Sequence, residues 1–116
     1  MTVAPRRASY AKIVAATERT WRARGGDPDV VGRLPALLRD AGLRVEHLCA
    51  HQRIARPGES MWHWVDSWWR NFVPKLVQME AISAEDALEF FADWDALRAD
   101  GDFALLPCVY EIVAVH

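Results

Sequence analysis

The N-terminal part of the chain carries the pattern of two helices. From Tyr10 onward, apolar side chains recur three and four residues apart with charged side chains largely opposite, which is typical of an amphipathic helix. Gly25 and Gly26 end this pattern, and Asp27 with Pro28 is typical of an N-cap and first helical turn, so a second helix is predicted from there. Its apolar positions are Val31, Leu34, Leu37, Leu38 and Ala41, and Pro35 is expected to divide it.

Two later stretches have the period of a strand. Over residues 43–54 the alternation places Leu43, Val45, His47, Cys49 and His51 on one face. Residues 109–115 are dense in β-branched side chains and predict a buried strand with apolar residues on both faces. Such a strand ordinarily lies between two others. One neighbour would be the first strand, and the other would come from a second copy or a partner chain.

Two further helices are predicted between these strands. One covers residues 60–79 and is expected to bend at Pro74, which lacks a backbone donor. Ser83 with Asp86 has the pattern of a capping box for a helix that runs to Gly101. The element order by itself suits two βα units of a parallel sheet. Two strands alone do not make a stable sheet, so helices or another chain must lie beside them.

Composition narrows the class of protein. A chain of 116 residues with 52% hydrophobic residues is sized for one globular domain. With 26% charged residues and a net charge of -2, it has no basic face for nucleic acid, so no nucleic-acid partner is expected. No apolar run approaches a membrane span, and two cysteines suit a reducing compartment, so we expect a cytoplasmic protein without a membrane partner. The unusual feature is six tryptophans.

Several short motifs follow one another in an order that has a parallel in a known family. They include Gly25-Gly26-Asp27-Pro28, Gly32-Arg33-Leu34-Pro35, Ala41-Gly42-Leu43, Arg56-Pro57-Gly58, Pro74-Lys75-Leu76-Val77 and Glu111-Ile112-Val113-Ala114. Over residues 27–116 the chain resembles the C-terminal, substrate-lid part of class I SAM-dependent methyltransferases of the small-molecule type. The resemblance implies an antiparallel strand pair in place of a parallel sheet. It predicts an α+β fold with about four helices around that pair, in a single domain, 1–116, in which 1–26 form an N-terminal helix.

The SAM-binding half of that family has no counterpart in the sequence. Such a unit needs a strand, a glycine-rich turn, a helix and an acidic ribose ligand over roughly 30 residues. No GxGxxG is present, and Gly25 and Gly26 follow a predicted helix instead of a strand. We therefore expect this chain alone to bind no cofactor and not to transfer methyl groups by itself.

Three functions are compatible with this resemblance. The first is a substrate-lid or accessory subunit that completes or regulates a separate SAM-dependent small-molecule methyltransferase. The second is a stand-alone small-molecule-binding protein, or a cofactor-independent cyclase or isomerase in natural-product biosynthesis. The third is a remnant or piece of a longer enzyme. The expected partners are a methyltransferase subunit or a second copy in a homodimer, together with a small-molecule ligand.

The tryptophan-rich helix is the main candidate for a ligand site. Its apolar side chains cover about half of its circumference, more than a surface helix usually buries. Either the helix combines core with a dimer contact, or it forms an aromatic wall for a flat small molecule. Trp68 is expected to belong to the core, and Trp62 or Trp69 to contact the ligand or partner. The candidate substrate-binding residues are Trp62, Trp64, Trp68, Trp69, Arg53 and Tyr110.

The first predicted strand also carries residues with reactive side chains. His47 and His51 lie four positions apart, about 13 Å along a strand, which is too far for one metal ion, so no metal site is predicted. His51 lies near the end of the strand and the lid, and it is the candidate catalytic residue, as a general acid or base. The alternative is a structural histidine. Tyr110 and Glu111 point to opposite faces of the last strand, so at most one of them lines a given cavity.

Overall fold

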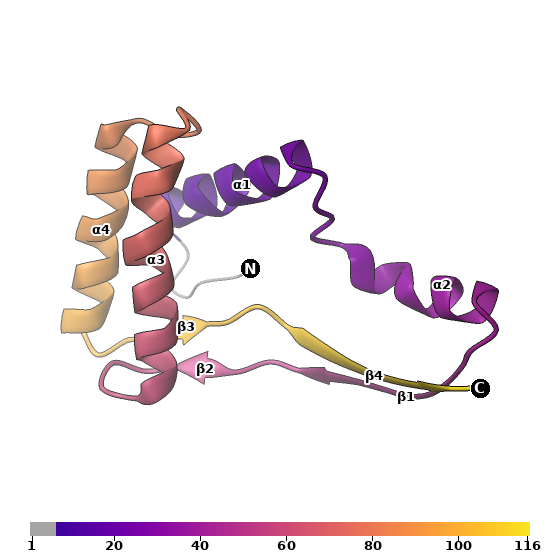
Figure 1. Ribbon diagram of the computed structural model, residues 1–116. Coiled ribbons are helices and arrows are strands. Elements are labelled where there is room, and N and C mark those ends of the chain that lie inside the picture. Colours follow the sequence, from indigo (N-terminus) through magenta and orange to yellow (C-terminus); the bar gives the residue numbers. More distant parts are fainter. Residues whose placement is uncertain (1–6) are drawn as a thin grey trace.

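The computed structural model describes residues 7–116 (Figure 1). It confirms the predicted α+β class, with four α-helices and short antiparallel strand pairs in this part of the chain. The elements are α1 (Ala8–Ala23), η1 (Val30–Gly32), α2 (Leu34–Asp40), β1 (Arg44–His51), β2 (Ile54–Ala55), α3 (Ser60–Gln78), α4 (Ala84–Ala99), β3 (Ala104–Leu105) and β4 (Val109–Val115).

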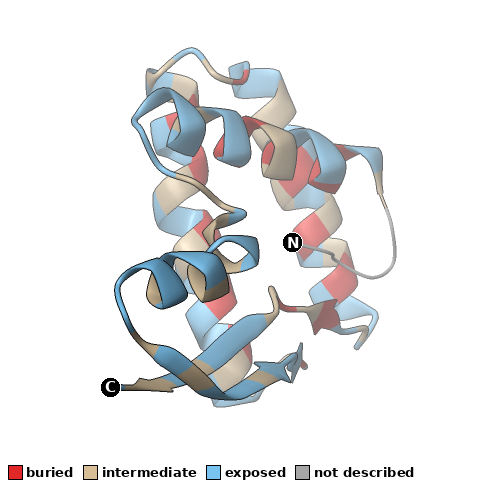
Figure 2. Cartoon of the chain, turned by 90° about the vertical axis from the view of Figure 1, so that its right-hand side faces the viewer, coloured by how far each residue is buried: buried red, intermediate tan, exposed pale blue. Residues whose placement is uncertain are grey.

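The hydrophobic core lies among α1, α3 and α4. Trp69, Phe90 and Trp94 are completely buried or nearly so, and the ring of Trp62 stacks on Trp94 with 4.6 Å between centroids. Tyr10 reaches the same cluster from α1 and donates a hydrogen bond of 3.0 Å to the carbonyl of Asp93. Figure 2 shows the buried positions on these helices and at the short strands beside them, whereas the β1–β4 ribbon is largely exposed. The core is therefore helical and aromatic.

The ribbon of β1 and β4 extends away from the three core helices (Figure 1). The two strands are antiparallel, as the resemblance implies, with His51 opposite Val109 and Arg44 opposite Val115. This extension gives a radius of gyration of 16.9 Å, compared with about 13 Å for a compact domain of 100 residues. The shape leaves much of the ribbon uncovered.

The strand predicted over residues 109–115 is present as β4, but the prediction that it is buried is wrong for the single chain. Val109 is 62% exposed, and Val113 is 44% exposed. The physical reason is that β4 pairs only with β1, and within residues 7–116 no strand lies along its other edge. The apolar side chains that suggested burial are present, but no second neighbour covers them.

The predicted face pattern of β1 is also wrong in part, because a β-bulge interrupts it. Val45 lies opposite Ala114, whereas His47 lies opposite Val113, so Glu46 is the extra residue. The bulge moves Val45 off the face that His47 shares with Cys49 and His51. Val45 then shares a face with Leu48 and Ala50.

The second helix begins later than predicted. The carboxylate of Asp27 accepts a hydrogen bond of 2.9 Å from the Asp29 N–H, which forms a local turn and not a helix N-cap. A single 3₁₀ turn follows, and α2 starts at Leu34 with Pro35 in its first turn. Pro35 therefore begins this helix instead of dividing it, as expected for a residue without a backbone donor.

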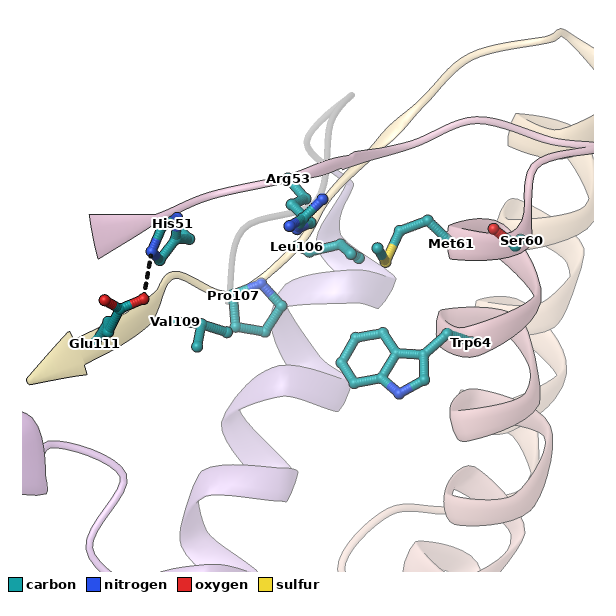
Figure 3. A pocket seen from close by; sticks show the side chains of 9 residues that line it. All are labelled: His51, Arg53, Ser60, Met61, Trp64, Leu106, Pro107, Val109 and Glu111. Atoms are coloured by element: carbon teal, nitrogen blue, oxygen red, sulfur yellow. Dashed lines mark hydrogen bonds and ion pairs between the residues drawn. The ribbon is translucent and has the colours of Figure 1, made fainter. Parts of the chain in front are cut away.

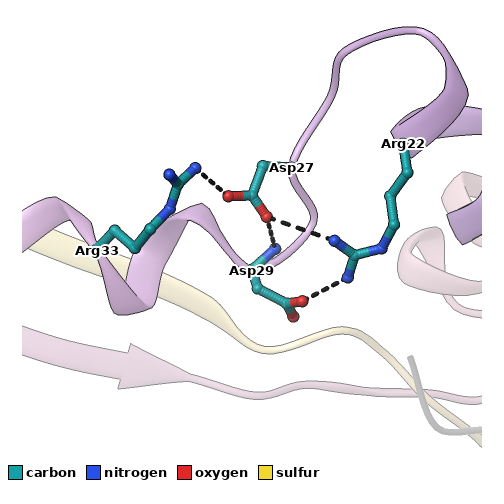
Figure 4. Close-up of polar contacts among 4 residues, drawn as sticks. All are labelled: Arg22, Asp27, Asp29 and Arg33. Carbon is teal, nitrogen blue, oxygen red and sulfur yellow. Dashed lines mark hydrogen bonds and ion pairs between the residues drawn. The ribbon is translucent and has the colours of Figure 1, made fainter.

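Four charged residues hold the connection between α1 and α2 (Figure 4). Arg22 contacts the Asp29 carboxylate at 2.5 Å and lies 3.9 Å from Asp27, which also pairs with Arg33. The Asp29 N–H and the Arg33 guanidinium hold the pKa of Asp27 below its ordinary value. The linker thus has a defined conformation that sets α2 against the ribbon.

Both predicted central helices are present, while the bend expected at Pro74 stays a prediction. α3 passes through Pro74 and ends at Gln78, and α4 begins with the expected capping box. The Ser83 hydroxyl accepts from the Asp86 N–H, and the Asp86 carboxylate accepts from the Ser83 N–H, each at 3.0 Å. Both signals are local in sequence, so no tertiary contact was needed to recognise them.

Candidate functional site

A hollow of about 630 Å³ lies between the start of α3 and the near end of the ribbon (Figure 3). It brings together three of the predicted site residues, His51, Arg53 and Trp64. Its volume is in the range of small-molecule sites. The remaining lining residues are Ser60, Met61, Leu106, Pro107, Val109 and Glu111.

Two hydrogen bonds to the Leu106 backbone hold residues 52 and 53 in place beside this hollow. The Leu106 N–H donates to the Arg53 carbonyl at 3.0 Å, and the Gln52 side-chain amide donates to the Leu106 carbonyl at 3.2 Å. These bonds bridge the gap between the β1–β4 and β2–β3 pairs. Arg53 is therefore held where the chain passes from the ribbon to the helices, and its side chain points into the hollow (Figure 3).

His51 has a carboxylate partner at the mouth of the hollow. Its Nε2 lies 3.3 Å from one oxygen of Glu111, and the Nε2 of His47 lies 3.4 Å from the other. Register places Cys49 directly opposite Glu111, between the two histidines. A carboxylate that orients an imidazole is the arrangement used by histidines that transfer protons. Glu111 was not among the predicted site residues, because the contact joins positions 60 residues apart.

The tryptophans of α3 divide between core and surface, but not as predicted. Trp62 is 2% exposed and Trp69 is completely buried, so neither presents a face to a ligand in the hollow. Trp68 is only partly buried and stacks on Phe72 at 4.7 Å. The prediction that Trp68 belongs to the core and that Trp62 or Trp69 contacts the ligand or partner is therefore wrong. The buried face of α3 instead consists of Trp62, Val65, Trp69, Val73 and Leu76. Trp64 lies off that face, is 60% exposed and forms a wall of the hollow.

Tyr110 lies on the opposite side of the ribbon from Glu111. It lines a second hollow of about 820 Å³ that is bounded by α1, the η1–α2 segment and the ribbon, with the buried Trp69 at its base. Contact with Cys108 raises the pKa of the Tyr110 hydroxyl. The residues predicted to bind one substrate therefore do not share a single cavity.

Other site types find little support in the part of the chain that the structure describes. Within residues 7–116, no three His, Cys, Asp or Glu side chains are grouped so as to hold a metal ion. The helices of this region are all too short or too polar to span a bilayer. The first hollow, with its apolar wall, one arginine and a histidine–carboxylate pair, is the best candidate for chemistry or binding.

Comparisons with known proteins provide no relative from which to transfer a function. No protein-family model, no curated protein and no solved structure matches the chain.

Proposed function

We propose that this chain is a substrate-lid and accessory subunit of a separate SAM-dependent small-molecule methyltransferase. The observation that carries the proposal is the outer edge of β4, which has no strand beside it within residues 7–116. Exposed edges of this length are usually covered or paired in folded proteins. A strand of the partner sheet would supply the missing neighbour.

The side chains of β4 support the same role. Val109, Tyr110 and Val113 are exposed large side chains on both faces of the strand. Strands that lie within a larger sheet, covered on both faces, have this composition, whereas solvent-exposed edge strands usually carry charges. Pairing with another chain would cover this apolar surface, which contributes favourably to association.

The position of the hollow suits a lid. It opens where α3 meets the ribbon, so a sheet added to the free edge of β4 would lie beside Val109 and Glu111. Substrate held against Trp64 would then face the added sheet. The methyl donor would be held by the partner chain.

Co-expression with a methyltransferase encoded beside this chain, and lacking its own last two strands, tests the proposal. We expect a heteromer in sedimentation and methyl transfer from labelled SAM only when both chains are present. Val113→Lys should abolish assembly by placing a charge on β4, while Leu88→Lys serves as the control, because Leu88 is 72% exposed on α4, away from the ribbon. A functional partner that assembles equally with Val113→Lys would overturn the role of β4, as would a homodimer formed through β4 that excludes the methyltransferase.

The second candidate is a stand-alone small-molecule-binding protein. It is favoured by one observation: the chain by itself forms a hollow of about 630 Å³, which is in the size range of small-molecule sites. Ligand binding by the chain alone, with no assembly through β4, would support this function over the accessory role.

A further inference from the structure

We propose that the hollow between α3 and the ribbon binds a flat aromatic carboxylate, with Arg53 holding the carboxylate and Trp64 contacting the ring. The inference deepens the small-molecule role proposed above and rests on it, but it does not depend on which partner chain is present. The function proposed above requires only a small molecule of unspecified chemistry, and this inference names its class.

The guanidinium of Arg53 favours an anionic ligand. The guanidinium of Arg53 has no ion-pair partner within residues 7–116, although its backbone carbonyl is hydrogen-bonded. The carboxylate that also lines the hollow, Glu111, instead contacts His47 and His51. Guanidinium groups bind carboxylates through two parallel hydrogen bonds, which gives both strength and orientation. An incoming carboxylate would therefore supply the partner that the chain does not.

The remaining surface favours a flat apolar body. Trp64 extends its indole into the hollow on one side, and Met61, Leu106 and Pro107 lie around the space between it and Arg53 (Figure 3). The ring of Trp64 has no aromatic partner among residues 7–116, in contrast to Trp62 and Trp68, which are stacked. An aromatic ligand would cover part of this exposed indole, and pairs of this kind add about 0.5 to 1.5 kcal/mol beyond area burial.

The imidazole of His51 lines the same hollow. It lies on the ribbon side, with Glu111 on its Nε2 (Figure 3).

Titration with 2-naphthoate and its uncharged counterpart 2-naphthamide tests the inference. Binding is followed by the indole N–H signals in NMR spectra, with the Trp64 signal assigned from Trp64→Phe. We expect saturable shifts of Trp64, tighter binding of naphthoate than of naphthamide, and a loss of about tenfold in naphthoate affinity in Arg53→Gln. Naphthamide affinity should be nearly the same in that variant.

Two control variants separate this site from general effects. Arg56→Gln removes an exposed arginine that does not line the hollow and should leave naphthoate affinity unchanged. Trp21→Ala removes an aromatic side chain of the second hollow and should also have no effect. Equal affinity for the acid and the amide, an unchanged affinity in Arg53→Gln, or no Trp64 shift at millimolar naphthoate would overturn the ligand class.

The outcomes also separate this inference from the accessory role. If naphthoate binds as expected but no heteromer forms, the ligand class stands and the accessory role fails. If the heteromer forms and transfers methyl groups but naphthoate does not bind, the ligand class alone is wrong.

Discussion

Trp64 and Trp69 lie on the same helix but in opposite environments. Trp69 is completely buried and packs edge-on against Phe90, with 5.3 Å between ring centroids. Trp64 is 60% exposed at the first hollow. Nothing in the sequence separates them, because the apolar side chains of α3 cover too broad an arc to fix its inward direction. The positions of α1 and α4 decide which tryptophans are buried.

This difference predicts unequal losses of stability. Trp69→Ala should lower the free energy of unfolding by about 3 to 5 kcal/mol, because it opens a large cavity in a fully buried site. Trp64→Ala should lower it by less than about 1 kcal/mol. Urea unfolding followed by circular dichroism measures both. Similar losses in the two variants would contradict the division of α3 into buried and ligand-facing tryptophans.

Asp86 predicts how stability depends on acidity. The Lys12 ammonium, 2.7 Å away, and the Ser83 N–H lower the pKa of this carboxyl from 3.8 to about 2. Because the folded pKa is depressed, the stabilisation is present above pH 3.8 and is lost as the pH falls toward 2. The melting temperature of the parent should therefore fall more steeply across this window than that of Asp86→Asn. Parallel curves would show that the capping carboxylate contributes nothing.

At the scale of whole elements, features set by neighbouring residues could be predicted from the sequence, whereas features set by strand pairing could not. The capping box of Ser83 and Asp86 lies within four consecutive residues, so its chemistry determines the start of α4 without outside help. The bulge at Glu46 depends on how β1 aligns with β4. The alternation of the two faces along the sequence continues through Glu46, so the sequence gives no sign of the bulge. The start of α2 was misplaced because Asp27 caps a turn as readily as a helix.

Pro74 provides a test of helix energetics. It lies inside α3, is exposed, and supplies no N–H to the helical hydrogen-bond ladder. Pro74→Ala should raise the free energy of unfolding by about 1 kcal/mol or more, because an interior proline costs roughly 3 kcal/mol relative to alanine before unfolded-state entropy is counted. Chemical denaturation measures this change. A less stable variant would indicate that α3 requires the proline at this position.

Considered as a whole molecule, the chain has a helical core and an uncovered ribbon. The helices and strands could be predicted from the sequence, because their patterns are local, but the element order alone suited a parallel sheet, and the antiparallel pair of the α+β class was predicted only from the family resemblance. The first hollow could be predicted only in part, because its lining joins residues 51–64 to residues 106–111 through long-range strand pairing.

The glycine pair predicts that the chain alone does not bind SAM. Gly25, with φ at +83°, ends α1, its N–H donates to the Arg22 carbonyl, and the N–H of Gly26 donates to the Trp21 carbonyl. Both N–H groups already donate hydrogen bonds within the chain, so they are not free to bind a cofactor. Calorimetric titration of the isolated chain with SAM should give only heats of dilution, whereas saturable binding at micromolar SAM would contradict this prediction.

The order in which the ribbon forms follows from its connectivity. His51 and Glu111 are 60 residues apart, and the segment between them contains the α3–α4 helical hairpin. Local helical contacts form faster than pairings that close a long loop, so the ribbon should close last during folding and open first in the native state. Its amide protons should exchange with deuterium before those of α3. Because His51, Val109 and Glu111 all lie on the ribbon, each such opening dismantles the first hollow and leaves the tryptophan core intact.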